Sequence, residues 1–152
     1  MQWSNISAIA FDLDGTLIDS VPDLAAATNA TLAQCQYPPV TEALVLSWVG
    51  NGARVLMQRA LSYASGMAEN TPELQALLKK TMPLFMLYYS EHLHTHSRLY
   101  SGVITTLQKL KQAGFKLAIV TNKPYRFTLP ILSAFGLDDV FSEEVTQKQL
   151  QD

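Results

Sequence analysis

The sequence predicts an α/β protein with a doubly wound, Rossmann-like parallel sheet and a helical domain inserted after the first strand. Two short apolar runs, residues 6–11 and 116–121, have the length and composition of buried parallel strands. A helical pattern lies on each side of the second run, which is typical of a doubly wound core. The long segment between the two runs, about residues 21–97, has only helical patterns, so we assign residues 1–20 and 98–152 to the core and 21–97 to the insertion.

The first strand and the first helix are separated by turn chemistry. Residues 6–11 are almost wholly apolar, which indicates a central strand buried on both faces. Asp14, Gly15 and Thr16 then interrupt the run. Ser20 is a suitable N-cap for a helix over residues 22–36, which the pair of prolines at 38–39 would end.

The insertion contains three further helical segments. We expect a helix over residues 42–48, a sharp loop at Gly50, Asn51 and Gly52, and a second helix over residues 53–64. A long helix should begin at Pro72, and Pro83 should kink or divide it.

The pattern after residue 102 returns to the core. Val103, Leu107 and Leu110 mark one face of a helix that ends at Gly114. The strand at 116–121 follows, and then a helix over residues 125–135, which Gly136 terminates.

Composition excludes several classes of protein. Hydrophobic residues make up 48% of the 152 and the net charge is −2, so the chain is neither disordered nor suited to binding a nucleic-acid backbone. No apolar run approaches the length of a membrane span, and the N-terminus lacks the basic start of a signal peptide. With a single cysteine, Cys35, we expect a soluble cytoplasmic protein.

Two aspartates lie where open α/β sheets bind their ligands. Asp12 and Asp14 directly follow the first strand, and Gly15 would allow a phosphate to approach the backbone. The residues alone leave two interpretations open, a catalytic pair or a turn with helix-capping carboxylates. Thr121 could likewise be a ligand or simply a β-branched residue that ends a strand.

The string FDLDGTLIDS, residues 11–20, closely resembles the first motif of the haloacid dehalogenase-like phosphatase superfamily. Residues 121–124, TNKP, resemble its second motif, and the helical insertion resembles a small cap placed after motif one. The stretch WVGNG with the following residues 55–61 is similar to the cap of bacterial phosphoglycolate phosphatases.

The resemblance implies roles for particular residues. Asp12 would attack the phosphorus and form an aspartyl-phosphate, and Asp14 would act as acid and then as base. Mg²⁺ would bind Asp12 and the Asp14 backbone carbonyl. The phosphoryl oxygens would meet Gly15, Thr16, Thr121 and Asn122. The implied reaction converts 2-phosphoglycolate to glycolate and phosphate; alternatives are another small phosphate ester or pyrophosphate.

Several other residues admit two interpretations. The loop Gly50, Asn51 and Gly52 could determine substrate specificity or simply connect two helices. Arg54 and Arg59 are expected to be solvated surface residues. His92, His94 and His96 have the wrong spacing for a metal site, so we interpret them as a polar end to the insertion.

The superfamily's third motif carries an essential lysine and its fourth carries acidic residues that complete the Mg²⁺ shell, and neither motif has a counterpart here. Residues 144–152 suggest a polar tail with no strand, and neither Lys148 nor Asp152 fits the missing roles. The resemblance thus implies a truncated fold whose first strand has an exposed edge open to self-association. A catalytically inactive fragment, or a module that binds phosphate or a partner, remains the alternative from outside the enzymes.

Overall fold

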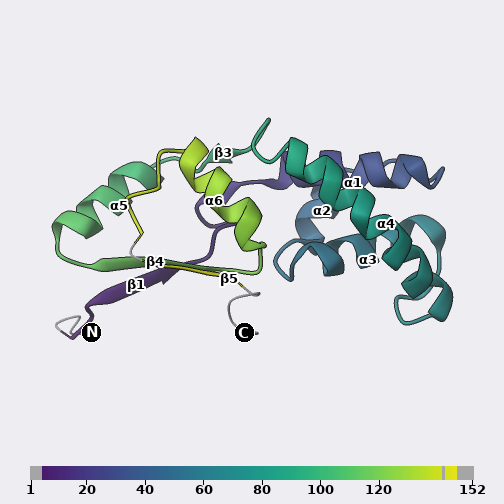
Figure 1. Cartoon of the computed structure of the whole chain (residues 1–152), viewed down its shortest axis with the longest axis horizontal. Helices are drawn as coiled ribbons and strands as arrows, with labels where there is room; N and C mark the ends of the chain where they lie inside the picture. Colours follow the sequence, from purple (N-terminus) through teal and green to yellow (C-terminus); the bar gives the residue numbers. More distant parts are fainter. Residues whose placement is uncertain (1–4, 142, 147–152) are drawn as a thin grey trace. The chain divides into compact units, whose positions relative to one another are not determined.

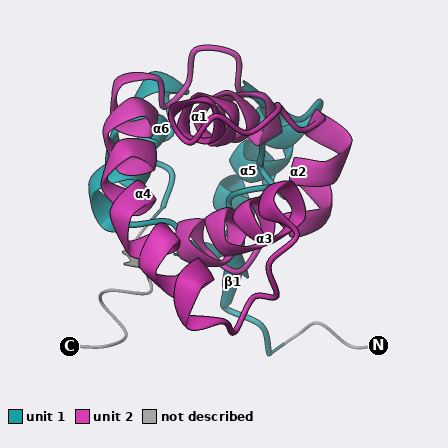
Figure 2. Cartoon of the chain, turned by 90° about the vertical axis from the view of Figure 1, so that its right-hand side faces the viewer, with its two compact units in different colours: residues 1–19, 98–152 teal, residues 20–97 magenta. Residues whose placement is uncertain are grey.

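The computed structural model describes residues 5–141 and 143–146, and the chain divides into two compact units (Figure 2). The first unit comes from residues 1–19 and 98–152, and the second from residues 20–97. The assignment of these parts to a core and a cap domain stays a prediction.

The first unit contains a parallel sheet of three described strands. β1 (Ala8–Phe11) pairs with β4 (Lys116–Thr121), which pairs in turn with β5 (Glu143–Thr146). α5 (Val103–Gln112) and α6 (Tyr125–Ala134) lie over the same face of this sheet (Figure 1). The core beneath these helices is formed by Leu107, Leu117, Ile119, Phe127, Ile131 and Leu132, each at most 3% exposed. The predicted α/β class with a parallel sheet is confirmed.

The environment of β1 differs from the prediction of a central strand buried on both faces. Ala8 and Ala10 are exposed, and Ile9 and Phe11 are half-buried. The physical reason is that β1 has one neighbour, β4, among the described strands, and that the described helices cover one face. A groove of about 550 Å³ lies beside β1 and is lined by Ile6, Ala8, Ile9, Ala10 and Phe115.

β5 corrects the expectation that residues 144–152 contain no strand. Its register with β4 places Glu143 opposite Ala118 and Thr146 opposite Thr121. The strand is defined by the pairing of its backbone with β4. Its two glutamates make the segment look polar in the sequence, but they do not prevent this backbone pairing. The interpretation of Lys148 and Asp152 lies outside the described residues.

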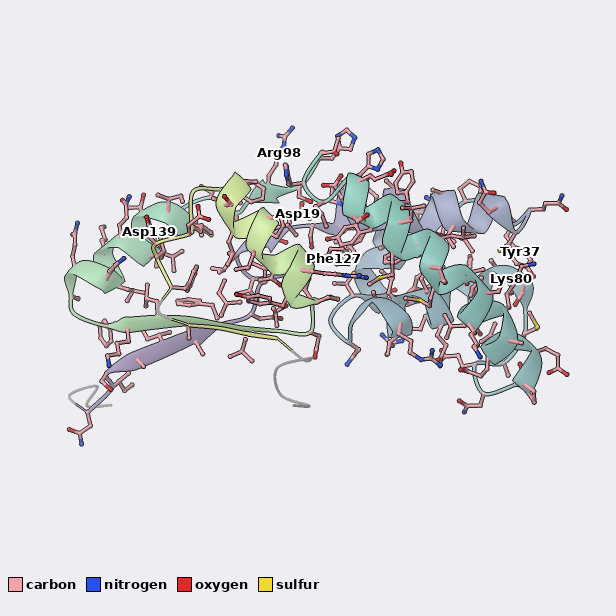
Figure 3. All side chains as sticks on the ribbon, viewed as in Figure 1. Asp19, Tyr37, Lys80, Arg98, Phe127 and Asp139 are labelled. Carbon is pink, nitrogen blue, oxygen red and sulfur yellow. The ribbon has the colours of Figure 1, made fainter. Side chains whose placement is uncertain are left out.

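A short antiparallel pair of strands joins the end of the first segment of this unit, residues 1–19, to the start of its second segment, residues 98–152. β2 (Ile18–Asp19) pairs with β3 (Arg98–Leu99), with Asp19 opposite Arg98 (Figure 3). The backbone N–H of Tyr100 also donates to the carbonyl of Leu17 at 3.1 Å. The chain therefore leaves this unit and returns to it at neighbouring points.

The second unit is helical, as predicted. It consists of α1 (Val21–Gln34), α2 (Glu42–Trp48), α3 (Ala53–Ser65) and α4 (Pro72–Glu91). Thr41 and Thr71 cap α2 and α4 by accepting backbone N–H groups two residues inside the helix, from Leu44 and Leu74. α4 runs as one helix of 20 residues with Pro83 inside it, so the prolyl residue does not divide it.

The apolar faces of these helices form a core of their own. Its fully or nearly fully buried members come from all four helices: Leu24, Leu32, Val45, Leu56, Met57, Leu61, Leu74, Leu78, Phe85 and Tyr89. The rings of Phe85 and Tyr89 stack one helical turn apart, with centroids 5.8 Å apart.

Candidate active site

Asp12 is the first residue after β1 and is exposed at the carboxyl end of the strand. One carboxylate oxygen, Oδ1, accepts the backbone N–H of Leu13 at 2.7 Å. Leu13 itself is fully buried, so the core fixes the backbone immediately after the aspartate. Because the Leu13 side chain is buried in the core, the carboxylate of the preceding Asp12 faces solvent.

The turn after Asp12 depends on a glycine. Gly15 has φ of +80°, a region that side chains with a Cβ rarely adopt. Its N–H donates to the carbonyl of Ile18 at 2.9 Å, while the N–H groups of Thr16 and Leu17 donate to the carbonyl of Leu13. These bonds form a turn that contains Asp14 and directly follows Asp12.

Asp14 forms an ion pair that the sequence analysis did not anticipate. Its Oδ1 lies 3.3 Å from Nζ of Lys123, and the two side chains are 16% and 3% exposed. Lys123 belongs to residues 121–124, the segment that resembles motif two, in which Thr121 and Asn122 are the predicted phosphate ligands. The signal that could have revealed it is a lysine two residues after a buried strand that pairs beside the Asp12 strand.

Thr121 ends β4 and is buried, and its Oγ1 accepts the backbone N–H of Lys123 at 3.1 Å. Phe11 lies opposite Ile119 in the sheet register, so the ends of β1 and β4 are adjacent. The sheet therefore brings Asp12, Asp14, Gly15, Thr16, Thr121 and Asn122 to one edge, with Asn122 exposed.

Gly50, Asn51 and Gly52 belong to the second unit. Gly50 and Gly52 have φ of +123° and +86°, which explains why the loop between α2 and α3 needs glycines. A guanidinium N–H of Arg59 donates to the carbonyl of Trp48 at 3.1 Å and to Oδ1 of Asn51 at 3.5 Å. The structure thereby corrects the expectation that Arg59 is merely solvated.

Arg54 also has a partner, because its Nη2 donates to Oε1 of Gln75 at 2.8 Å. His92 stacks on Tyr88 at a centroid distance of 4.4 Å, with Nδ1 2.9 Å from the Tyr88 carbonyl oxygen. Among the residues that the structure describes, no three His, Cys, Asp or Glu side chains gather into a metal-binding cluster.

The Asp12 site nevertheless has ligands of the right kind for Mg²⁺. A carboxylate and a backbone carbonyl are hard oxygen donors, and protein-bound Mg²⁺ commonly keeps several waters and takes one or two carboxylates with a substrate phosphate. The residues present fit such a partly protein-bound ion.

Comparison with known proteins decides the family. The family model described as haloacid dehalogenase-like hydrolase matches residues 9–152. The chain belongs to the haloacid dehalogenase-like hydrolase family. The matched range includes every residue of the site at the ends of β1 and β4.

Several members of this family resemble the chain more closely. It is 47% identical over 149 residues to a phosphoglycolate phosphatase of Mannheimia succiniciproducens, covering 97% of this chain and 65% of that protein. A phosphoglycolate phosphatase of Vibrio cholerae is 48% identical over 142 residues, or 93% of this chain and 62% of the relative. The chain thus spans less than two thirds of the length of these curated relatives.

A solved structure extends this likeness to the fold. The crystal structure of a predicted phosphoglycolate phosphatase from Haemophilus somnus superposes with a TM-score of 0.85 at 43% identity. The superposition covers 99% of this chain and 67% of that one.

In the described part of this chain, no helix is both long and apolar enough to cross a bilayer.

Proposed function

We propose that the chain carries the catalytic aspartates of a Mg²⁺-dependent phosphoric monoester hydrolase. The observation that carries the proposal is the placement of Asp12 and Asp14 on one turn after β1, with the ammonium of Lys123 3.3 Å from Asp14. A nucleophile, a proton carrier and a cation beside them are the groups that hydrolysis of a phosphate ester requires. Membership of a hydrolase family supports the same chemistry.

In the proposed reaction, a carboxylate oxygen of Asp12 attacks phosphorus while the bond from phosphorus to the ester oxygen breaks. Asp14 gives its proton to the departing alkoxide, which leaves as an alcohol, and Asp12 holds the phosphoryl group as an aspartyl-phosphate. Asp14, now a carboxylate, then takes a proton from water, whose oxygen attacks phosphorus. Inorganic phosphate departs, and Asp12 and Asp14 return to their starting states.

The phosphoryl group needs donors and positive charge around it. The backbone N–H groups at Gly15 and Thr16, with the side chains of Thr121 and Asn122, would donate to its oxygens. The carboxylate of Asp12 and the backbone carbonyl of Asp14 would hold Mg²⁺, which offsets the repulsion between an anionic nucleophile and an anionic phosphate.

The proposed substrate is 2-phosphoglycolate, which would yield glycolate. Its support is the name phosphoglycolate phosphatase carried by relatives 47–48% identical to the chain. Gly50, Asn51 and Gly52, tied to α3 through Arg59, would contribute to substrate choice from the helical unit. Another small phosphate ester or pyrophosphate is the alternative.

The free thiol of Cys35 favours the reducing cytoplasm as the location of the protein.

The test is steady-state release of phosphate from 2-phosphoglycolate by the 152-residue chain. We expect turnover that disappears with a chelator, returns with added Mg²⁺, and falls by ~10³-fold or more in Asp12→Asn. Asp138→Asn, at an exposed position of the same unit, is the matched control and should keep wild-type turnover. Turnover that survives Asp12→Asn would refute the proposed nucleophile.

A second candidate function is self-association without catalysis. β1 has a single strand neighbour among the described residues, and the adjoining groove is lined by apolar side chains. An edge of this kind presents backbone N–H and carbonyl groups to another strand, and a second copy offers the same strand in return.

Sedimentation velocity over a range of concentrations tests the self-association. We expect a dimer that weakens in Ala8→Lys, because a lysine on an edge strand disfavours pairing. Ala113→Lys, an exposed position after α5, serves as the charge-matched control. A wild-type chain that sediments as a monomer at every concentration would contradict this candidate.

A further inference from the structure

We propose that Lys123 is a positioning residue that holds the Asp14 carboxylate in place at the ends of β1 and β4. The proposal deepens the proposed function, because Asp14 is the proton carrier there. It rests on an ion pair between two segments more than a hundred residues apart in the sequence.

The burial of Lys123 is the first support. Its side chain is 3% exposed, and an ammonium group so deprived of water is stable only where an anion or several acceptors compensate it. The Asp14 carboxylate, with Oδ1 at 3.3 Å, supplies that anion.

The anchoring of Lys123 is the second support. Its N–H donates to Oγ1 of Thr121 at 3.1 Å. The hydroxyl of Thr128 lies 3.4 Å from the Lys123 carbonyl oxygen and 3.2 Å from that of Pro124, so its hydrogen bond is shared between the two. Thr121 ends β4, and Thr128 is a fully buried residue of α6. Strand and helix therefore fix the backbone from which the ammonium reaches Asp14.

Positioning matters because proton transfer depends on geometry. The turn fixes the backbone of Asp14, but its side chain can still rotate among staggered positions. A carboxylate displaced by about 1 Å from the leaving oxygen loses much of its effect on rate. Lys123 selects one position of this carboxylate and adds a positive charge beside an anionic substrate.

A double-mutant cycle in urea tests the ion pair without any assay of activity. The variants are Asp14→Asn, Lys123→Met and the double variant. We expect the shift in unfolding midpoint of the double variant to be much smaller than the two single shifts combined. Lys116→Met, an exposed lysine at the other end of β4, is the matched control and should combine additively with Asp14→Asn. Additive shifts for Lys123→Met would overturn the proposal.

Steady-state kinetics then tests the consequence for turnover. We expect Lys123→Met to lower kcat about 10- to 100-fold with KM changed less than about twofold. Lys123→Arg should recover part of the loss, because a guanidinium can still contact the carboxylate. An unchanged kcat, or a loss confined to KM, would overturn the positioning role.

The two proposals fail separately. Wild-type turnover that does not depend on Asp12 would refute the proposed function, whereas the urea cycle decides whether Lys123 holds Asp14 in either case.

Discussion

Asp23 is a buried carboxylate, 1% exposed, in the first turn of α1. Both of its oxygens accept the backbone N–H of His96 at 3.0 Å, and Oδ2 also accepts the N–H of Ser97 at 2.8 Å and its hydroxyl at 2.6 Å. Charged acceptors make the stronger hydrogen bonds in proteins, and their loss leaves buried donors unpaired. This single side chain thus ties the start of the helical unit to its end.

At the residue scale we predict that Asp23→Ala lowers the free energy of unfolding by about 3 kcal/mol. Ser97→Ala removes only the hydroxyl bond and should cost about 1 kcal/mol. Urea denaturation followed by circular dichroism measures both, with the exposed Asp138→Ala as control. An Asp23→Ala variant as stable as the control would show that the carboxylate contributes nothing net.

At the scale of elements, α4 contains a proline that does not end it. Pro83 is exposed in the middle of the helix, and having no N–H it leaves the carbonyl of Lys79 without its helical donor. Pro72, in contrast, stands at the first helical position, where no helical bond is lost. The two prolines therefore differ in one respect that affects stability: Pro83 removes a helical hydrogen bond and Pro72 does not.

We predict that Pro83→Ala raises the free energy of unfolding by about 1–2 kcal/mol, since the regained hydrogen bond outweighs the added freedom of the unfolded chain. Pro72→Ala should leave the stability unchanged or slightly lower. Thermal unfolding of the two variants beside the wild type is the measurement. Equal shifts for both would contradict the explanation from the missing bond.

At the scale of the whole molecule, the helical unit of residues 20–97 has the features of an independently folding domain. Its core draws on all four helices, and the bonds of Asp23 to His96 and Ser97 bring its two ends together. A domain whose ends meet can be inserted in another without distorting either one.

We predict that a fragment of residues 20–97 folds alone and unfolds in one cooperative thermal transition. Far-ultraviolet circular dichroism should show a helical spectrum that is lost sigmoidally on heating. The same fragment with Asp23→Ala should melt at a lower temperature, because its ends lose their tie. A gradual, non-cooperative loss of helix would refute the domain assignment that the sequence predicts.

Local chemistry made much of the fold predictable. The strand at 116–121 matches the prediction residue for residue, and helices such as Glu42–Trp48 agree because a capping threonine and the following loop define their ends. β5 and the β2–β3 pair were missed, since strands of four and two residues are defined by their backbone partners and not by their own pattern. The exposure of β1 depends on which strands and helices pack against it, and the residues of β1 do not specify these neighbours.

The sequence by itself determined the α/β class, the helical insertion and the position of Asp12 and Asp14 after a strand, because these follow from local periodicity and from motifs of adjacent residues. The tertiary structure alone decided that Lys123 meets Asp14, that Arg59 holds Asn51 and that Asp23 binds Ser97. Asp23 and Ser97 are 74 residues apart in the chain and Asp14 and Lys123 are farther apart still, whereas Asn51 and Arg59 are separated by 8. Only the folded backbone brings such residues within hydrogen-bonding distance, and burial then gives the charged partners their importance.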